Sequence, residues 1–208
     1  MEAARPGGAR RVGLWHHPPM VAVKIPIMER DYLVLEAAAE TRHEFVGGEI
    51  LAMAGSEYAH NLICSNFVFE LRQALGDRRC SVLGADQRVK VESRKEYLYP
   101  DVTVSCLEPK LVPPRPASLV NPQVIIEVLS PSTERYDRVD KWFTYQQIPT
   151  LTDYVMVASD RMLVEHQQRG PGDSWIYRKL SRDDVLSLSN GVTLPVLALY
   201  RMVPELEV

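Results

Sequence analysis

The segment Val124–Leu129 constrains the fold more than any other part of the chain. Its residues VIIEVL are apolar apart from Glu127, and the segment ends at Ser130-Pro131-Ser132. A short apolar run rich in β-branched residues is typical of a strand that is buried on both faces of a sheet. A carboxylate inside such a strand is costly unless a partner or a cation compensates its charge. Glu127 therefore indicates a site at the centre of the fold.

Helical spacing of apolar residues predicts helices on both sides of this strand in the sequence. One helix is expected over 29–39 and a second over Tyr58–Leu75, with Gly76 following as a stop. A third is expected from Ser132 or Thr133 to about 147, because either hydroxyl can cap a helix.

Turn residues and alternating patterns predict the strands. Gly47-Gly48 lies between two short apolar segments and predicts a tight hairpin turn. Further strands are expected at 82–83, 87–91, 99–106, 154–157, 163–166, 175–180 and 192–199. The order of elements indicates an α+β fold, a mixed β-sheet flanked by α-helices.

The chain of 208 residues suits one well-buried domain, which we place at 28–208. Residues 1–27 are rich in Gly, Pro and Arg without periodicity, so we expect a disordered lead-in. A basic arm that contacts a polyanion, or translation starting at Met20 or Met28, are the alternatives for this segment. No apolar run approaches the ~20 residues that span a bilayer, so a membrane protein is not expected.

Charge and cysteine content narrow the classes of function. The net charge of −3 means that nucleic-acid binding would need a local basic patch. The three cysteines, Cys64, Cys80 and Cys106, are odd in number and contain no CxxC pair, so we expect neither a disulfide framework nor a zinc cluster. The reducing cytoplasm is therefore the expected location of the protein. Phosphate-cradling glycine motifs are absent, which argues against a nucleotide cofactor.

Four charged residues could form one site. Asp101 follows Pro100 at the start of the strand expected at 99–106. Glu127 lies inside the next expected strand, Val124–Leu129. If the two strands pair, their carboxylates can converge on Mg²⁺, which prefers oxygen ligands. Glu44 could complete the set, and Lys141 could place a positive charge beside a metal-bound water or a phosphate.

Each of these residues also has an ordinary structural interpretation. Asp101 could be a turn residue and Glu44 a solvent-facing hairpin residue. Lys141 follows Asp137 by four residues, the spacing of a surface ion pair worth about 0.3 kcal/mol. Glu127 is the hardest to explain in this way, because its neighbours on both sides are apolar.

Weaker candidates lie elsewhere. His60, near the start of the second helix, could polarise a phosphate, but capping and packing are the favoured interpretation. The strands expected at 87–91 and 99–106 form a second hairpin, and a group of basic residues on it is either solvated or in contact with a DNA backbone. The group comprises Arg88, Lys90, Arg94 and Lys95.

Six short motifs, taken in order, resemble a large bacterial family of restriction-endonuclease-like proteins in the PD-(D/E)XK nuclease superfamily. They are RHEFVGGEILAMAG, an HN pair, YPDVTV, VIIEVLSPST, D-x-x-DK-x-x-x-Y and IPTLTDYVMVA. The match runs from about Glu29 to Val203, and the combined string is specific although PD alone is not. The resemblance implies a restriction-endonuclease-like core, with the active carboxylates on a central pair of strands.

The resemblance also implies roles for individual residues. Pro100-Asp101 matches the PD and Glu127 the (D/E), while the backbone carbonyl of Val128 would bind the metal. Leu129 stands where the superfamily motif has lysine, and Lys141 on the following helix is the matching position in this family. Glu44 matches an additional acid on the N-terminal element of many members.

These expectations combine into one functional hypothesis and two rivals. The hypothesis is an endonuclease that hydrolyses DNA phosphodiester bonds with Mg²⁺, for which Mn²⁺ could substitute. The first rival is a catalytically inactive nuclease fold that serves as a DNA-binding or protein-interaction module, since the motif lysine is missing. The second is an interaction protein whose acids are structural. DNA is the expected partner, and a homodimer is permitted but not required.

Overall fold

The computed structural model describes residues 26–208 except 54, 132, 205, 207 and 208. Its central feature is a six-stranded sheet in the order β12-β11-β10-β9-β6-β3. The strands are β3 (Ser81–Gly84), β6 (Val102–Ser105), β9 (Val124–Leu129), β10 (Asp153–Ala158), β11 (Val164–Arg169) and β12 (Trp175–Leu180). The sheet is mixed, because β9 and β10 run parallel whereas the other neighbours are antiparallel.

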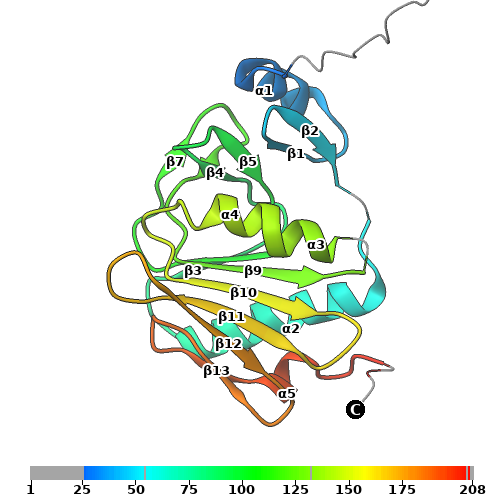
Figure 1. The fold of residues 1–208 in the computed structure, drawn as a ribbon, viewed down its shortest axis with the longest axis vertical. Helices are drawn as coiled ribbons and strands as arrows, with labels where there is room; N and C mark the ends of the chain where they lie inside the picture. The colour runs from blue at the N-terminus through cyan, green and yellow to red at the C-terminus, as the bar shows by residue number, and fades with distance from the viewer. Residues whose placement is uncertain (1–25, 54, 132, 205, 207–208) are drawn as a thin grey trace, which may run out of the picture.

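A second six-stranded sheet lies between the first sheet and α1 (Glu29–Ala38), at the top of Figure 1. Its order is β2-β1-β5-β4-β8-β7. The strands are β1 (His43–Val46), β2 (Glu49–Ala52), β4 (Val89–Val91), β5 (Glu96–Leu98), β7 (Leu111–Val112) and β8 (Ser118–Leu119). A small hairpin of β13 (Val185–Ser187) and β14 (Thr193–Pro195) completes the strands of the described residues. The predicted α+β class is confirmed. The sequence predicted one mixed sheet, whereas the structure divides most of the strands between two six-stranded sheets.

Strand β9 is buried along its whole length, as its sequence predicts. Val124, Ile126 and Val128 pack in one apolar cluster, and Ile125 and Leu129 pack in another on the opposite face. This alternation is the two-residue period of a strand. Glu127 therefore shares the face of Ile125 and Leu129.

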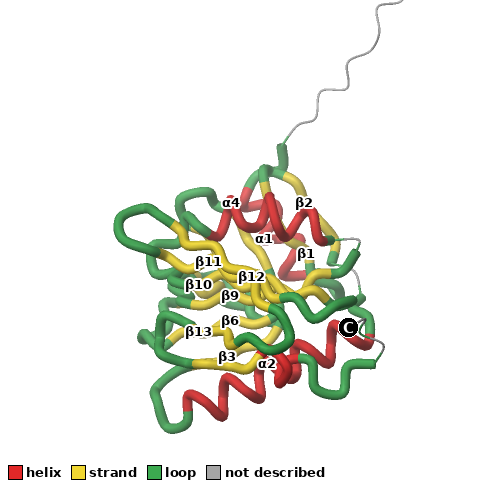
Figure 2. Tube along the Cα trace, turned by 60° about the horizontal axis from the view of Figure 1, so that its bottom comes forward, coloured by secondary structure: helices red, strands yellow, loops and turns green. Residues whose placement is uncertain are grey.

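Helices cover both faces of this sheet (Figure 2). On one side lies α2 (Tyr58–Leu75), whose Ile63, Phe67 and Leu71 join the cluster of the even-numbered β9 residues. On the other side lies the predicted third helix, built from α3 (Glu134–Tyr136), a π-helical turn (Asp137–Lys141) and α4 (Trp142–Tyr145). Glu127 thus faces the helix that carries Lys141.

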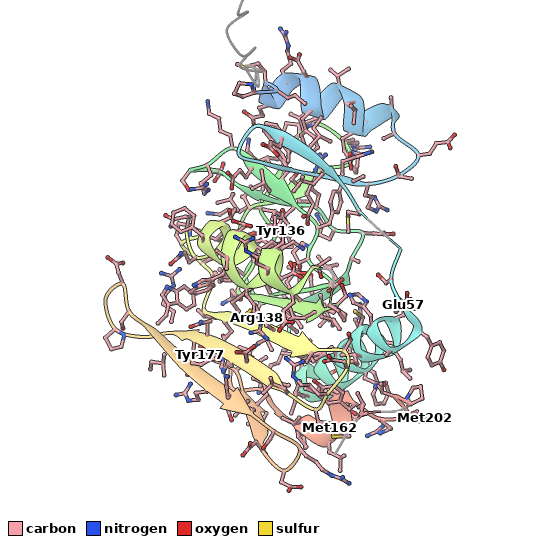
Figure 3. All side chains as sticks on the ribbon, turned by 45° about the vertical axis from the view of Figure 1, so that its right-hand side comes forward. Glu57, Tyr136, Arg138, Met162, Tyr177 and Met202 are labelled. Atoms are coloured by element: carbon pink, nitrogen blue, oxygen red, sulfur yellow. A yellow bond between two sulfur atoms is a disulfide. The ribbon has the colours of Figure 1, made fainter. Side chains whose placement is uncertain are left out.

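Contacts from the third helix extend beyond β9 to the edge of the sheet. Glu165 on β11 pairs with Arg138 and accepts a hydrogen bond from Tyr177 on β12. Figure 3 shows Arg138 and Tyr177 at this junction of helix and sheet. The helix that covers Glu127 is therefore also tied to the edge of the sheet.

The predicted strand 99–106 is wrong at its beginning. Strand β5 ends at Leu98 in the second sheet, and β6 begins at Val102 in the first. Pro100 lies between them, and it lacks the backbone N–H that a ladder needs. The chain therefore changes sheets at Pro100-Asp101, and Asp101 is left at the mouth of β6.

The predicted strand 192–199 is also wrong in part. Thr193–Pro195 is β14, but Val196–Leu199 forms the short helix α5, which packs on α2. A brief apolar run does not distinguish a buried strand from a buried helical turn, so the sequence pattern alone was insufficient here.

The expectation that the chain has no disulfide is corrected by a bond between Cys80 and Cys106. Ser81 pairs with Ser105 in the antiparallel ladder of β3 and β6, so the residues just outside the ladder also face each other. Their separation of 26 residues gives no local sign of this contact. Cys64 is a free thiol.

The N-terminal part of the second sheet follows the predicted hairpin. Val46 pairs with Glu49 across Gly47-Gly48, and both glycines have positive φ, as a two-residue turn of this kind requires. Ile27 donates its backbone N–H to the Gly48 carbonyl at 2.9 Å. Residues 1–25 of the expected lead-in lie outside the described residues. None of the helices in the described part of the chain has the length and apolar character needed to cross a membrane.

Candidate active site

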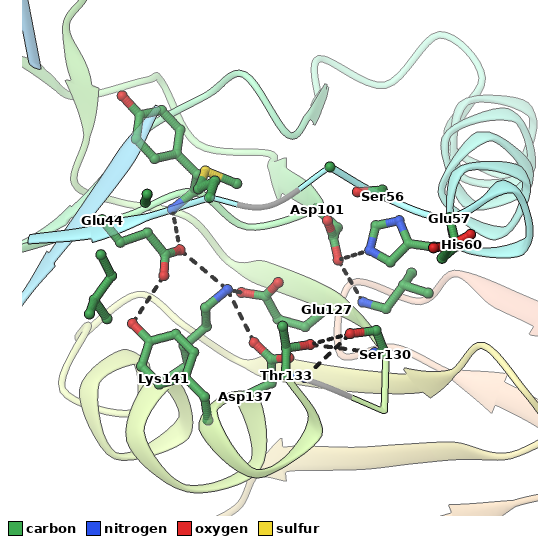
Figure 4. Close-up of a pocket in the computed structure, with 17 residues that line it drawn as sticks. Glu44, Ser56, Glu57, His60, Asp101, Glu127, Ser130, Thr133, Asp137 and Lys141 are labelled. Atoms are coloured by element: carbon green, nitrogen blue, oxygen red, sulfur yellow. Dashed lines mark hydrogen bonds and ion pairs between the residues drawn. The ribbon is translucent and has the colours of Figure 1, made fainter. Parts of the chain in front are cut away.

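A cavity of about 290 Å³ opens where the two sheets, α2 and the third helix meet (Figure 4). The four residues predicted from the sequence all line it: Glu44, Asp101, Glu127 and Lys141. Each comes from a different element or junction, namely β1, the mouth of β6, β9 and the π-helical turn. The predicted gathering of these side chains is therefore present in the fold.

Lys141 is the centre of a buried charge network. Its Nζ lies 3.1 Å from Glu127 Oε1, 3.2 Å from Glu44 Oε1 and 3.2 Å from Asp137 Oδ1. All four side chains are buried. Asp137 and Lys141 are thus a buried pair within the site, and the interpretation of this spacing as a surface ion pair is wrong. Glu44 belongs to the core of the network, so its interpretation as a solvent-facing hairpin residue is wrong.

The strand geometry shows how Lys141 reaches the face of β9 from which a lysine at position 129 would project. Residue 129 projects from the same face of β9 as Glu127, but Leu129 packs there in an apolar cluster. The helix that covers this face brings Lys141 to Glu127 instead. The ammonium group consequently reaches the carboxylate from the helix and not from the strand.

Hydroxyl and amide donors orient the carboxylates of this network. The Tyr145 hydroxyl donates to Glu127 Oε1 at 3.1 Å, and the Tyr136 hydroxyl donates to Glu44 Oε2 at 3.0 Å. The backbone N–H of Tyr99 donates to Glu44 Oε1 at 3.0 Å. These bonds satisfy buried acceptors that would otherwise destabilise the fold.

Asp101 occupies the other side of the cavity and has different partners. Its Oδ2 accepts the backbone N–H of Val128 at 2.7 Å and lies 3.1 Å from His60 Nε2. Val102 pairs with Ile126 in the β6–β9 ladder, which confirms that the two acid-bearing strands are neighbours. His60 was only a weaker candidate from the sequence: the HN pair marked it, but its proximity to Asp101, 41 residues away, was not visible.

The electrostatics of the cavity favour binding of a cation. Burial raises the pKa of Glu127 well above its usual range, and Asp101, Asp137 and Glu44 add to the effect of burial against the opposing charge of Lys141. Burial alone would lower the pKa of Lys141, but the surrounding carboxylates hold it well above its usual range. Burial likewise raises the pKa of Asp137. Three carboxyl groups share the ammonium group of Lys141, and the fourth, that of Asp101, lies across the cavity, so the donor set fits a hard divalent cation.

The backbone of Val128 is oriented in agreement with the same site. Its N–H points towards Asp101, beyond the end of the β6 ladder. In an extended strand the N–H and C=O of one residue point to the same edge. The Val128 carbonyl is therefore directed to the side of β9 where Asp101 lies.

Comparison with known proteins identifies the family of the chain and agrees with its fold. Residues 30–199 match the Uma2 family, described as "Putative restriction endonuclease". The chain belongs to this family. One Synechocystis relative is 32% identical over 161 residues, covering 77% of this chain and 91% of the relative. A second is 29% identical over 174 residues, covering 82% and 90%.

A solved structure has the same fold as this Uma2 chain. A crystal structure described as "a putative nuclease" from Anabaena variabilis superposes with a TM-score of 0.69. The match covers 84% of this chain and 98% of that one, at 15% sequence identity. At this identity the comparison establishes the fold, which is the nuclease-like fold that the motifs implied.

The group of Arg88, Lys90, Arg94 and Lys95, considered as a possible DNA contact, requires a correction at Arg88. Arg88 is buried, with its Nε donating to Ser118 Oγ at 2.8 Å and its Nη2 to the Pro116 carbonyl at 2.7 Å, so it is not a surface contact for DNA. These partners lie about 30 residues away in the sequence, which is why the hairpin pattern did not reveal them. Lys90 pairs with Glu29 and Arg94 with Glu96, while Lys95 is exposed.

Proposed function

We propose that the protein is a metal-dependent endonuclease that hydrolyses phosphodiester bonds of DNA with Mg²⁺, or with Mn²⁺ in its place. One observation carries the proposal: Lys141 Nζ lies 3.1 Å from Glu127, on the face of β9 from which a lysine at position 129 would project. Lys141 on the helix would thereby take the place of the lysine that the superfamily motif has at position 129. Family membership supports the same activity.

Asp101, Glu127 and the Val128 carbonyl are the groups that would hold the ion. Bound there, the ion would supply Lewis-acid stabilisation of phosphate charge and a water of lowered pKa. The Val128 N–H donates a hydrogen bond to the Asp101 carboxylate and fixes it at the end of β9, in position to bind the ion. The Tyr145 hydroxyl does the same for Glu127.

Lys141 has the charge and the position for a role in the hydrolysis. The carboxylates of Glu44, Glu127 and Asp137 keep it protonated, so it can donate hydrogen bonds but cannot act as a base at neutral pH. It would orient the attacking water and offset negative charge that develops on the phosphate. Glu44 and Asp137 act through Lys141, since both hold its ammonium group in place.

The experiment is a cleavage assay on supercoiled plasmid, linear duplex and single-stranded DNA, with Mg²⁺, Mn²⁺ or a chelator. We expect cleavage that requires the ion and is lost in Lys141→Met. Lys179→Met is the matched control, because Lys179 is an exposed lysine on β12. DNA binding without ion-dependent cleavage of any form would contradict the proposal and favour the inactive DNA-binding module.

A further inference from the structure

A second group of potential metal ligands adjoins the acidic network. His60, Cys64 and Asp101 each offer one ligand atom, and these atoms all lie within 4.8 Å of one another. His60 and Cys64 are one helical turn apart near the start of α2, and Asp101 approaches from the mouth of β6. The functional proposal above gives a role to Asp101 alone among these three.

The separation of His60 from Asp101 has a specific meaning for metal binding. His60 Nε2 lies 3.1 Å from Asp101 Oδ2, and both side chains line the cavity. Two adjacent ligands of an octahedral ion with bonds of about 2.1 Å are about 3 Å apart. The two atoms can therefore bind one ion as neighbouring ligands with little movement of either side chain.

The second ring nitrogen of His60 also has a partner. Cys64 Sγ lies 3.6 Å from His60 Nδ1. Metal-binding histidines usually direct their other ring nitrogen to a hydrogen-bonding group, which fixes the orientation of the ring. The thiol can donate to Nδ1, or accept from it when Nε2 uses its lone pair for an ion. Burial raises the pKa of Cys64, so the sulfur remains a thiol in the absence of metal.

We infer that His60 is a direct ligand of the ion through Nε2, which makes this a mixed nitrogen and oxygen site that binds Mn²⁺ or Co²⁺ in preference to Mg²⁺. The inference rests on the proposed metal site at Asp101 and Glu127. Imidazole suits transition ions, whereas Mg²⁺ favours carboxylate, carbonyl and water ligands. The nitrogen donor consequently sets which ion the site selects.

The test is calorimetric titration of the full chain, without DNA, with MnCl₂, CoCl₂ and MgCl₂. His60→Ala removes the ligand. His60→Gln retains an N–H that can donate to Asp101 but lacks the imidazole nitrogen. His43→Gln is the matched control, because His43 Nδ1 also lies 3.1 Å from a carboxylate, that of Glu36, and does not line the cavity. Melting curves of the metal-free variants show whether each one is folded.

We expect wild type to bind Mn²⁺ and Co²⁺ more tightly than Mg²⁺. His60→Ala and His60→Gln should both lose on the order of 100-fold in affinity for Mn²⁺ and Co²⁺, and much less for Mg²⁺. The visible absorption of bound Co²⁺ should shift in both variants and stay unchanged in His43→Gln.

The alternatives have distinct outcomes. If His60→Gln keeps the wild-type affinity for Mn²⁺, His60 only orients Asp101 and the inference is wrong, while the nuclease proposal stands. Equal losses for Mg²⁺ and Mn²⁺ in His60→Ala would overturn it in the same way. If wild type binds none of these ions, both the inference and the metal-dependent nuclease fail.

Discussion

Replacement of Glu127 by glutamine tests the acidic site most directly. The side chain is buried in β9, beside Asp101, Asp137 and Glu44, with Lys141 as its cationic partner. Glutamine has nearly the same shape, and its carbonyl oxygen can still accept from Lys141 and Tyr145. The substitution therefore removes a charge while the packing and the hydrogen bonds are retained.

The expected effect on the metal-free protein follows from the direction of the pKa. Because the pKa of Glu127 is raised in the folded state, the folded protein holds a proton that the unfolded chain releases. Stability is therefore lost as the pH rises from the unfolded pKa through the folded one, and the loss persists above that range. Each unit of raised pKa corresponds to ~1.4 kcal/mol. Glu127→Gln should leave the metal-free protein at neutral pH as stable as wild type, or more stable by an amount of this order.

Metal should reverse this ranking. An ion that binds only the folded state stabilises it by about 2.7 kcal/mol when its concentration is 100 times the dissociation constant. Wild type should gain this stability from Mg²⁺ or Mn²⁺, and Glu127→Gln should lose most of the gain together with the cleavage. The measurement is denaturant unfolding of wild type and Glu127→Gln near neutral pH, with and without the ion.

A matched control and a clear contrary result complete the test. Glu96→Gln also neutralises a buried glutamate, but the cavity does not include Glu96, so this variant should keep the wild-type response to metal. If wild type gains nothing from Mg²⁺ or Mn²⁺ and Glu127→Gln badly destabilises the metal-free protein, Glu127 is a structural partner of Lys141. That result would refute a metal site at Glu127.

Three further predictions concern the supports of the fold and site. Lys141→Met leaves the carboxylates of Glu44, Glu127 and Asp137 without their cation. It should therefore lower the free energy of unfolding by about 3–5 kcal/mol at pH 7, and by less at pH 5. Denaturant unfolding curves at both pH values check this. Burial alone would raise the pKa of Glu96, but hydrogen bonds from Arg94, Thr144 and the Gly47 N–H lower this pKa in the folded protein. The ionised Glu96 therefore stabilises the fold above the unfolded-state pKa, and this stabilisation is lost as the pH falls through the folded-state pKa. Glu96→Gln should accordingly lower the melting temperature less in acid than at neutral pH. Reduction of Cys80–Cys106, or the double change to serine, should lower the free energy of unfolding by up to about 3.5 kcal/mol, the entropy of closing a loop of this length; equal melts with and without reductant would contradict this.

The sequence by itself determined the local elements and the identity of the acidic residues. The run VIIEVL predicted a strand buried on both faces, and the structure has that strand as β9. Gly47-Gly48 predicted the hairpin turn, and Gly76 the end of α2. These features depend on side-chain period and backbone freedom within a few residues, which is the information that a short stretch of sequence contains.

Part of the site could also be predicted, because chemistry alone marks some residues. A carboxylate among apolar strand residues is costly, so Glu127 indicated a compensating charge before any partner was known. The motif order then pointed to Asp101, Glu44 and Lys141. The structure places all of them around one cavity, and it adds Asp137, which had been interpreted as half of a surface pair.

Only the tertiary structure decided which distant segments meet. The register of β3 against β6 brings Cys80 to Cys106, and the covering helix brings Lys141 to the face that Leu129 leaves without a charge. The fold likewise places His60 beside Asp101 and encloses Arg88 among backbone carbonyl and hydroxyl acceptors. Such contacts depend on strand register and helix packing between segments far apart in the chain, and local periodicity contains no information about either.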